Sequence, residues 1–114
     1  MDRFSRKELR DAVATTPAGV FRIRNRATGR CLVQASTNLP AAENRLAFAL
    51  ATQSFGAIDR RLVPDATASG LGSLEFTVVE RLERRPGGDA AEFRAELDAL
   101  AALVREGHDP DELY

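Results

Sequence analysis

Four arginines are the residues of this sequence best suited to contact phosphate groups. Arg22 and Arg24 alternate along a stretch of aromatic and β-branched residues, and Arg26 and Arg30 follow in and after a short polar segment. Guanidinium groups gathered on one surface bind phosphates through charge and hydrogen bonds. The pattern therefore indicates possible nucleic-acid contact. Alternating arginines are also typical of a solvent-facing strand, or of ion-pair partners for acids elsewhere in the chain.

The charge distribution supports a local basic surface but not a basic protein. Residues 1–30 contain eight basic and three acidic side chains, a balance of +5, and the remainder contains eight basic and fourteen acidic ones, a balance of −6. The formal net charge of the chain is −1. The molecule as a whole is therefore not expected to seek polyanions.

Two other candidates for chemistry are weaker. His108 precedes Asp109, Asp111 and Glu112, which offer metal ligands without a recognised metal-site spacing, so residues 108–114 are interpreted as a loosely ordered acidic tail. Cys31 is the single cysteine and cannot form an internal disulfide. Within an apolar strand it is interpreted as a small core residue.

A β-hairpin from Gly19 to Ser36 must position the arginines. Its turn, residues 25–29, begins with Asn and ends with Gly, which supply the backbone freedom that a reversal needs. Phe21 and Ile23 share one side of the first strand, and the arginines share the other. The second strand is apolar on both sides apart from Gln34, which predicts a central strand covered on both faces.

The remaining elements follow from capping and periodicity. A capping box predicts a helix over residues 2–13, and Thr37 or Asn38 can cap an alanine-rich helix whose first turn contains Pro40. Helical spacing continues over residues 54–63, Pro64 is expected to end it, and residues 65–73 are expected to be a surface loop. Alternation predicts a strand over residues 74–82, and a last helix is expected to start after Asp89 and to end at Gly107.

Together these elements predict an α+β fold in a single domain covering residues 1–114. The order is helix, two strands, one or two helices, strand and helix. A chain of 114 residues can bury one core without metal or disulfide support. It contains neither a signal-peptide pattern nor an apolar run near 20 residues, so a soluble, cytoplasmic protein with no membrane association is expected.

The hairpin resembles the signature of the GIY-YIG nuclease superfamily. The two signature strands correspond to Gly19-Val20-Phe21 and Leu32-Val33-Gln34, and the chain is similar to a subgroup of small bacterial domains in GV-RIRN, the loop Asn38-Leu39-Pro40 and Asn44-Arg45. The resemblance implies a small three-stranded antiparallel sheet flanked by helices. It also implies a nuclease site with two tyrosines, a basic residue on the following helix and a glutamate that binds one divalent metal.

Several of these implied catalytic positions are substituted. Phe21 and Leu32 occupy the tyrosine positions, and Gln34 replaces the signature glycine. On the helix, Leu46 and Ala47 replace a histidine and an arginine of the bacterial subgroup. Without a phenol, no proton can be relayed at these positions.

Three charged residues are still able to serve such a site. Arg45 could contact a phosphate, and Glu96 or Asp98 falls near the position of the metal-binding glutamate. An isolated surface arginine and exposed helix acids are also common without any such role.

The sequence therefore predicts a catalytically degenerate GIY-YIG domain that acts as a nucleic-acid or protein interaction module. DNA would contact the basic hairpin face of Arg22, Arg24, Arg26 and Arg30, and a partner protein or self-association is the other possibility. The alternative is an active DNA endonuclease with a rearranged site, using Arg45 together with Mg or Mn held by Glu96 or Asp98. A metal cofactor is expected only in that case.

Overall fold

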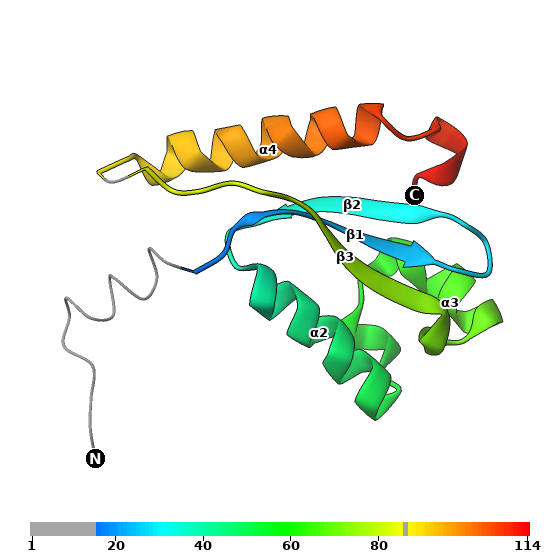
Figure 1. Ribbon diagram of the computed structural model, residues 1–114. Helices are drawn as coiled ribbons and strands as arrows, with labels where there is room; N and C mark the ends of the chain where they lie inside the picture. Colours follow the sequence, from blue (N-terminus) through cyan, green and yellow to red (C-terminus); the bar gives the residue numbers. More distant parts are fainter. Residues whose placement is uncertain (1–15, 86) are drawn as a thin grey trace, which may run out of the picture.

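A three-stranded sheet lies between two layers of helices. The computed structural model describes residues 16–85 and 87–114, so the helix expected over residues 2–13 lies outside the described part. Helix α2 (Leu39–Thr52) covers one face of the sheet and helix α4 (Ala90–Glu106) covers the other (Figure 1). The α+β class and the small antiparallel sheet flanked by helices are confirmed.

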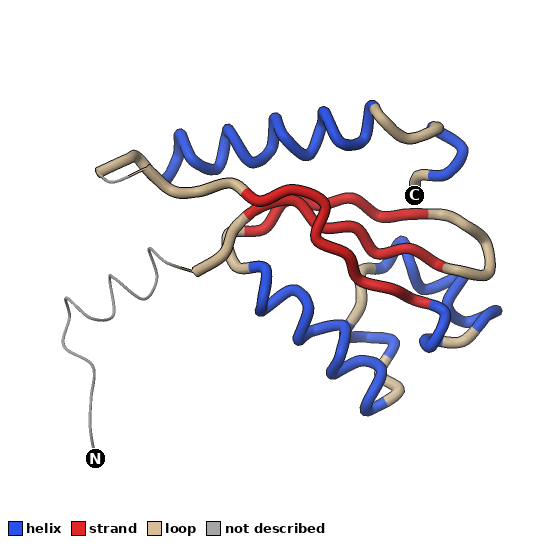
Figure 2. The backbone as a smooth tube through the Cα atoms, viewed as in Figure 1, coloured by secondary structure: helices blue, strands red, loops and turns tan. Residues whose placement is uncertain are grey.

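The central strand is the first strand of the hairpin. Strands β1 (Gly19–Asn25), β2 (Cys31–Ser36) and β3 (Leu74–Arg81) form an antiparallel sheet in the order β2-β1-β3 (Figure 2). The prediction of a hairpin is confirmed, and the prediction that its second strand is central is wrong. β2 is covered on both faces as expected, yet it lies at an edge of the sheet.

The edge of β2 is covered by the end of the chain, which explains its apolar composition. Leu113 forms a parallel bridge with Cys31, and the Tyr114 amide donates to the Cys31 carbonyl at 3.0 Å. Arg105, near the end of α4, donates to the Val33 carbonyl at 2.7 Å. The predicted loosely ordered tail is therefore wrong, since residues 110–112 form a short 3-10 helix and the residues after it pack on the sheet.

Gly19 allows β1 and β3 to approach closely. A Cβ atom at this position would lie 2.1 Å from the Glu80 carbonyl oxygen, which is far inside contact distance. The β1–β3 register shifts between Val20 and Phe21, so β3 contains one extra residue there. A residue with a side chain at position 19 would have to displace the β3 backbone.

The segment after α2 differs from the expected helix and loop. Asn38 caps α2 by accepting from the Ala41 amide, as predicted, and the left-handed conformation of Gln53 (φ 53°) ends the helix. Residues 55–57 and 60–62 then form two short 3-10 helices in place of a continued helix. Pro64 starts helix α3 (Val63–Ser69) instead of ending a helix, because a proline in the first turn lacks only an amide that has no partner within the helix.

Helix α3 replaces most of the expected surface loop, because its small residues pack and bond back onto the helix. Ala66 is fully buried. The Thr67 and Ser69 hydroxyls donate to the Val63 and Asp65 carbonyls, each at 2.8 Å. A polar, small-residue segment of this kind becomes helical when a hydrophobic core is available to cover it.

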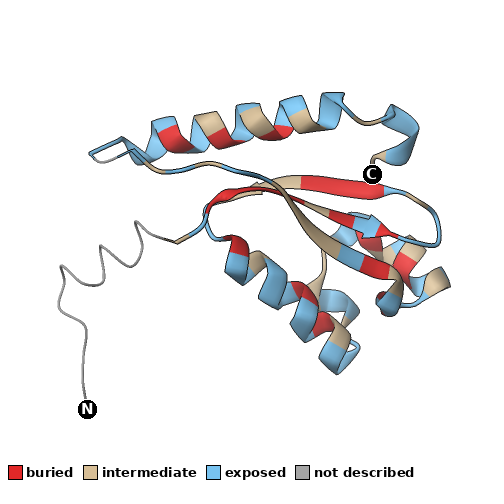
Figure 3. Cartoon of the chain, in the orientation of Figure 1, coloured by how far each residue is buried: buried red, intermediate tan, exposed pale blue. Residues whose placement is uncertain are grey.

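The two faces of the sheet contain separate clusters of buried side chains. Phe21, Ile23 and Leu32 pack with Leu46 of α2, whereas Val20 and Val33 pack with Ala101 of α4, and Phe93 and Leu97 of α4 are also buried. Figure 3 shows the buried positions of α2 and α4 on the sides that face the sheet. The expected cap at Asp89 is confirmed, since its side chain accepts from the Ala91 amide.

Within residues 16–85 and 87–114, no helix combines the length and the apolar character needed to cross a membrane.

Candidate functional site

A pocket of about 430 Å³ lies on the α2 side of the sheet. We call it the α2 pocket; it is bounded by β1, β2, α2, the 3-10 helix of residues 55–57 and the two residues that follow that helix. Its volume falls in the range of pockets that hold small molecules or single side chains. Its lining is mainly apolar and includes Phe21, Ile23, Leu32, Ala42, Leu46 and Ile58, with Gln34, Arg45 and Asp59 as polar members.

The two positions at which the resemblance implies tyrosines line this pocket. Phe21 and Leu32 are buried, and the Phe21 ring stacks on Phe76 with centroids 5.0 Å apart. Neither side chain has a hydroxyl that could hold or transfer a proton. What these two residues contribute to the pocket is apolar surface.

Asp59, a polar residue in the lining of the α2 pocket, is held in place by hydrogen bonds. Asp59 accepts two hydrogen bonds of 3.0 Å from the Arg61 guanidinium and one of 2.9 Å from the Arg61 amide. The hydrogen bonds from the Arg61 side chain lower the pKa of Asp59 to about 2, so this carboxylate is ionised at neutral pH. Gln34 Nε2 donates to Asp59 at 3.3 Å, which ties β2 to the segment after α2. Sequence reasoning missed Asp59, although Asp before Arg-Arg after a helix is a signal for a cap.

Arg45 also lines the α2 pocket. It is exposed on α2 next to the buried Leu46. The rim of the pocket therefore combines one exposed guanidinium with a carboxylate that is already paired with Arg61.

The late-helix acids lie on the other side of the sheet from Arg45. Glu96 pairs with Arg85 at 3.8 Å and Asp98 pairs with Arg94 at 3.3 Å. Helix α4 packs against the face formed by Val20 and Val33, whereas Arg45 lies on the helix of the opposite face (Figure 1). The structure therefore does not bring Arg45 together with Glu96 or Asp98. Within residues 16–85 and 87–114, no group of three or more His, Cys, Asp and Glu side chains is arranged to hold a metal ion.

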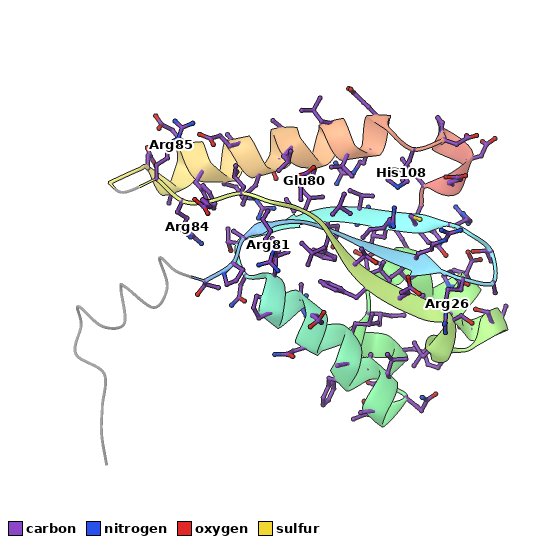
Figure 4. The ribbon with its side chains drawn as sticks, viewed as in Figure 1. Arg26, Glu80, Arg81, Arg84, Arg85 and His108 are labelled. Atoms are coloured by element: carbon purple, nitrogen blue, oxygen red, sulfur yellow. The ribbon has the colours of Figure 1, made fainter. Side chains whose placement is uncertain are left out.

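The four hairpin arginines have different surroundings and do not form one open basic face. Arg22 is half-buried beneath the end of α4, where its Nη1 lies 3.3 Å from His108 Nε2. Arg26, at the hairpin tip, donates to the Gly72 carbonyl (Figure 4). Arg30 lies 3.7 Å from Asp65, and Arg24 is exposed.

Tyr114 packs beside Arg30 at the turn end of the hairpin. Its hydroxyl donates to Asp65 at 2.7 Å, and the Arg30 guanidinium stacks 4.4 Å from its ring centroid. Burial, followed by the hydrogen bond to Asp65, raises the pKa of Tyr114 to about 12. Burial also raises the pKa of the Cys31 thiol, which fits the interpretation of Cys31 as a core residue.

Asn25 is a structural residue whose importance sequence reasoning did not identify. It is fully buried; its Oδ1 accepts from the Ala27 and Thr28 amides, and its Nδ2 donates to Ser69 Oγ at 2.9 Å. The side chain therefore shapes the hairpin turn and joins it to α3. Its position in the GV-RIRN motif was the available signal.

The fold and the pocket define a small α+β domain with an apolar recess between the sheet and one helix. Comparison of the chain with models of known families, with curated proteins and with solved structures found no match. The resemblance to GIY-YIG nucleases stays a prediction.

Proposed function

We propose that this protein is a non-catalytic interaction module with a GIY-YIG-like fold, and that its α2 pocket receives an apolar side chain of a partner protein. The observation that supports this proposal most directly is the apolar lining of the pocket. Phe21 and Leu32, the positions at which the resemblance implies tyrosines, contribute apolar surface there.

The distribution of charged groups favours binding over phosphodiester cleavage. Cleavage needs an activated water and groups that stabilise the charge developing on the phosphate. Arg45 lines the α2 pocket, but Glu96 and Asp98 lie across the sheet from it and are paired with arginines of their own. These residues would have to act from opposite faces of the sheet to serve one reaction.

Two exposed aromatic residues are near pocket-lining residues in the sequence, and they favour a protein partner. Phe48 is 58% exposed and lies three residues after Arg45 on α2, and Phe55 is 36% exposed and adjoins the pocket-lining Gly56. Exposed aromatic rings beside an apolar recess are typical of protein-binding surfaces. Arg45 at the rim favours a partner segment in which an acidic residue lies near the apolar anchor.

The hairpin arginines support a nucleic-acid partner less well. Arg22, Arg26 and Arg30 each contact another part of the chain, through His108, the Gly72 carbonyl and Asp65 respectively. Non-specific nucleic-acid binding depends on several cations that are free to replace the counterions of the phosphates.

Selection of random displayed peptides against the full chain tests the proposal. We expect enrichment of peptides that combine a large apolar residue with a nearby acid. Ala57→Trp, which places a large ring at the lining of the pocket, should abolish binding of the selected peptides. Arg45→Ala should weaken binding severalfold, because an exposed ion pair contributes roughly 0.2–1 kcal/mol. Arg24→Ala, an exposed arginine on the hairpin, is the matched control and should bind normally.

The same preparations allow outcomes that would overturn the proposal. Absence of enriched peptides, or equal binding to Ala57→Trp, contradicts the pocket as the binding site. Cleavage of duplex or branched DNA in Mg or Mn that is lost in Arg45→Ala, Glu96→Ala or Asp98→Ala would establish the endonuclease instead. Salt-sensitive DNA binding that is lost on substitution of the hairpin arginines would identify nucleic acid as the partner.

A further inference from the structure

The two edges of the sheet differ in whether another part of the chain bonds to them. On β2, the carbonyls of Cys31 and Val33 accept from the Tyr114 amide and the Arg105 side chain, so the C-terminal segment covers this edge. β3 forms the other edge, and within residues 16–85 and 87–114 no strand pairs with its outer side. An edge strand without a neighbouring strand presents hydrogen-bonding groups to which another strand can pair.

The outward-facing groups of β3 follow from the antiparallel pattern. Residues of such a strand alternate between those that bond to the neighbouring strand and those that face away. The Arg26 amide bonds to the Ser73 carbonyl, and Arg24 and Arg22 lie opposite Glu75 and Thr77, so these positions of β3 bond to β1. The backbone groups of the alternate residues, Leu74, Phe76 and Val78, therefore point away from β1, and of these the Leu74 amide donates to the Leu71 carbonyl.

The part of β3 with which another strand could pair is the five-residue segment 74–78. Irregular backbone lies on both sides of it. A 3-10 helix (Leu71–Ser73) precedes it, and the extra residue Val79 follows it where the register shifts. Beyond the shift, Glu80 pairs with Val20 and Arg81 with Gly19, and Figure 4 shows Glu80 towards α4 and Arg81 towards the α2 side. Residues 74–78 are thus regular, with Phe76 at their centre.

We infer that β3 pairs with β3 of a second copy of this chain, antiparallel and centred on Phe76. In this register Leu74 faces Val78 of the other copy and Phe76 faces Phe76. The Phe76 amide and carbonyl, the Val78 amide and the Leu74 carbonyl of each strand then find a partner, whereas the Leu74 amide already donates to the Leu71 carbonyl of its own chain. A register shifted by two residues in either direction would bring the irregular Val79 or the 3-10 helix into the ladder. The irregularities that bound the segment therefore select one symmetric arrangement.

The side chains of the segment are compatible with this register. On the α2 side, the half-buried Phe76 and Val78 would meet apolar residues of the other copy. On the opposite side, Glu75 would face Thr77, so a carboxylate meets a hydroxyl and no like charges lie directly opposite each other. Glu75 is exposed and Thr77 is half-buried. Both positions can therefore be reached by a neighbouring strand.

Sedimentation of the full chain through a dilution series is the first test. We expect a dimer that dissociates on dilution. Val78→Pro removes an outward amide and leaves the bonds between β3 and β1 in place, so it should weaken dimerisation by at least about tenfold, or roughly 1.4 kcal/mol. Val78→Ala keeps the amide and is the matched control for the shortened side chain. A monomer at every concentration would overturn the inference.

Disulfide trapping tests the register without depending on Val78→Pro. Glu75→Cys and Thr77→Cys chains should cross-link rapidly when the two are mixed, because residues 75 and 77 lie directly opposite in the inferred register. Each variant alone should cross-link slowly, since its two cysteines lie diagonally. Equal cross-linking in the mixture and in the separate samples would contradict this arrangement. The test uses a surface distinct from the α2 pocket, so its failure would leave the proposed function unaffected.

Discussion

Replacement of Asn25 by alanine should destabilise the protein more than any surface substitution of the same kind. Asn25 is 0% exposed, and its side chain makes three hydrogen bonds, to the Ala27 and Thr28 amides and to Ser69 Oγ. Each such bond contributes about 1 kcal/mol net, and a buried group left without its partner costs more. The two amides belong to exposed residues and can recover part of the loss through water.

We therefore expect Asn25→Ala to lower the free energy of unfolding by about 2–3 kcal/mol. For a chain of 114 residues this corresponds to a fall in Tm of roughly 10 °C. Urea unfolding followed by circular dichroism measures the change directly. Because only local bonds are lost, the midpoint should move while the slope with denaturant stays constant.

Two further variants separate the contributions to this loss. Ser69→Ala removes the bond to Asn25 and leaves the turn bonds intact, so it should cost about 1 kcal/mol. Asn44→Ala, an exposed asparagine on α2, should change the free energy of unfolding by less than about 0.5 kcal/mol. A loss below about 1 kcal/mol for Asn25→Ala would refute the argument that this side chain holds the hairpin to α3.

Three other predictions concern packing and titration. Gly19→Ala should destabilise the protein by about 1–3 kcal/mol through a clash with β3, whereas Gly56→Ala, with open space around its Cβ position, should be nearly neutral in the same unfolding assay. Tyr114→Phe should cost about 1 kcal/mol near neutral pH, through loss of the bond to Asp65. Because the pKa of Tyr114 is raised from 10 to about 12, the stability gained from the neutral phenol is fully present below pH 10 and is lost as pH rises through 12, so the two proteins should converge in alkaline unfolding curves. The pKa of Asp59 is lowered from 3.8 to about 2, so its contribution to the free energy of unfolding is present above pH 3.8 and is lost as pH falls through 2. Asp59→Asn should therefore reduce the dependence of the free energy of unfolding on pH below 3.8. An unchanged dependence would contradict the assigned hydrogen bonds.

Local signals in the sequence predicted the elements that depend on neighbouring residues. The hairpin, the cap at Asn38 and the cap at Asp89 were all recognisable, because turn and capping bonds join residues only a few positions apart. Periodicity likewise located β3 and α4, because one face of each is buried. The α+β class followed from the order of these elements.

Two of the wrong predictions involve contacts between distant parts of the chain. Apolar residues on both sides of residues 31–35 predict a central strand, but β2 is an edge strand covered by Arg105 and Tyr114. The small residues of 65–73 predict a loop, but most of them belong to α3, because so short a segment is helical only against a core that other elements build.

For the candidate site, too, some features follow from the sequence and others only from packing. The sequence by itself determined the residue types: apolar side chains at Phe21 and Leu32, and charged ones at Arg45 and in the last helix. Only the tertiary structure decided that Arg45 lies beside an apolar pocket, and that Glu96 and Asp98 lie across the sheet from it. The physical reason is that residue chemistry is local, whereas the face of a sheet that a helix covers depends on packing among elements far apart in the chain.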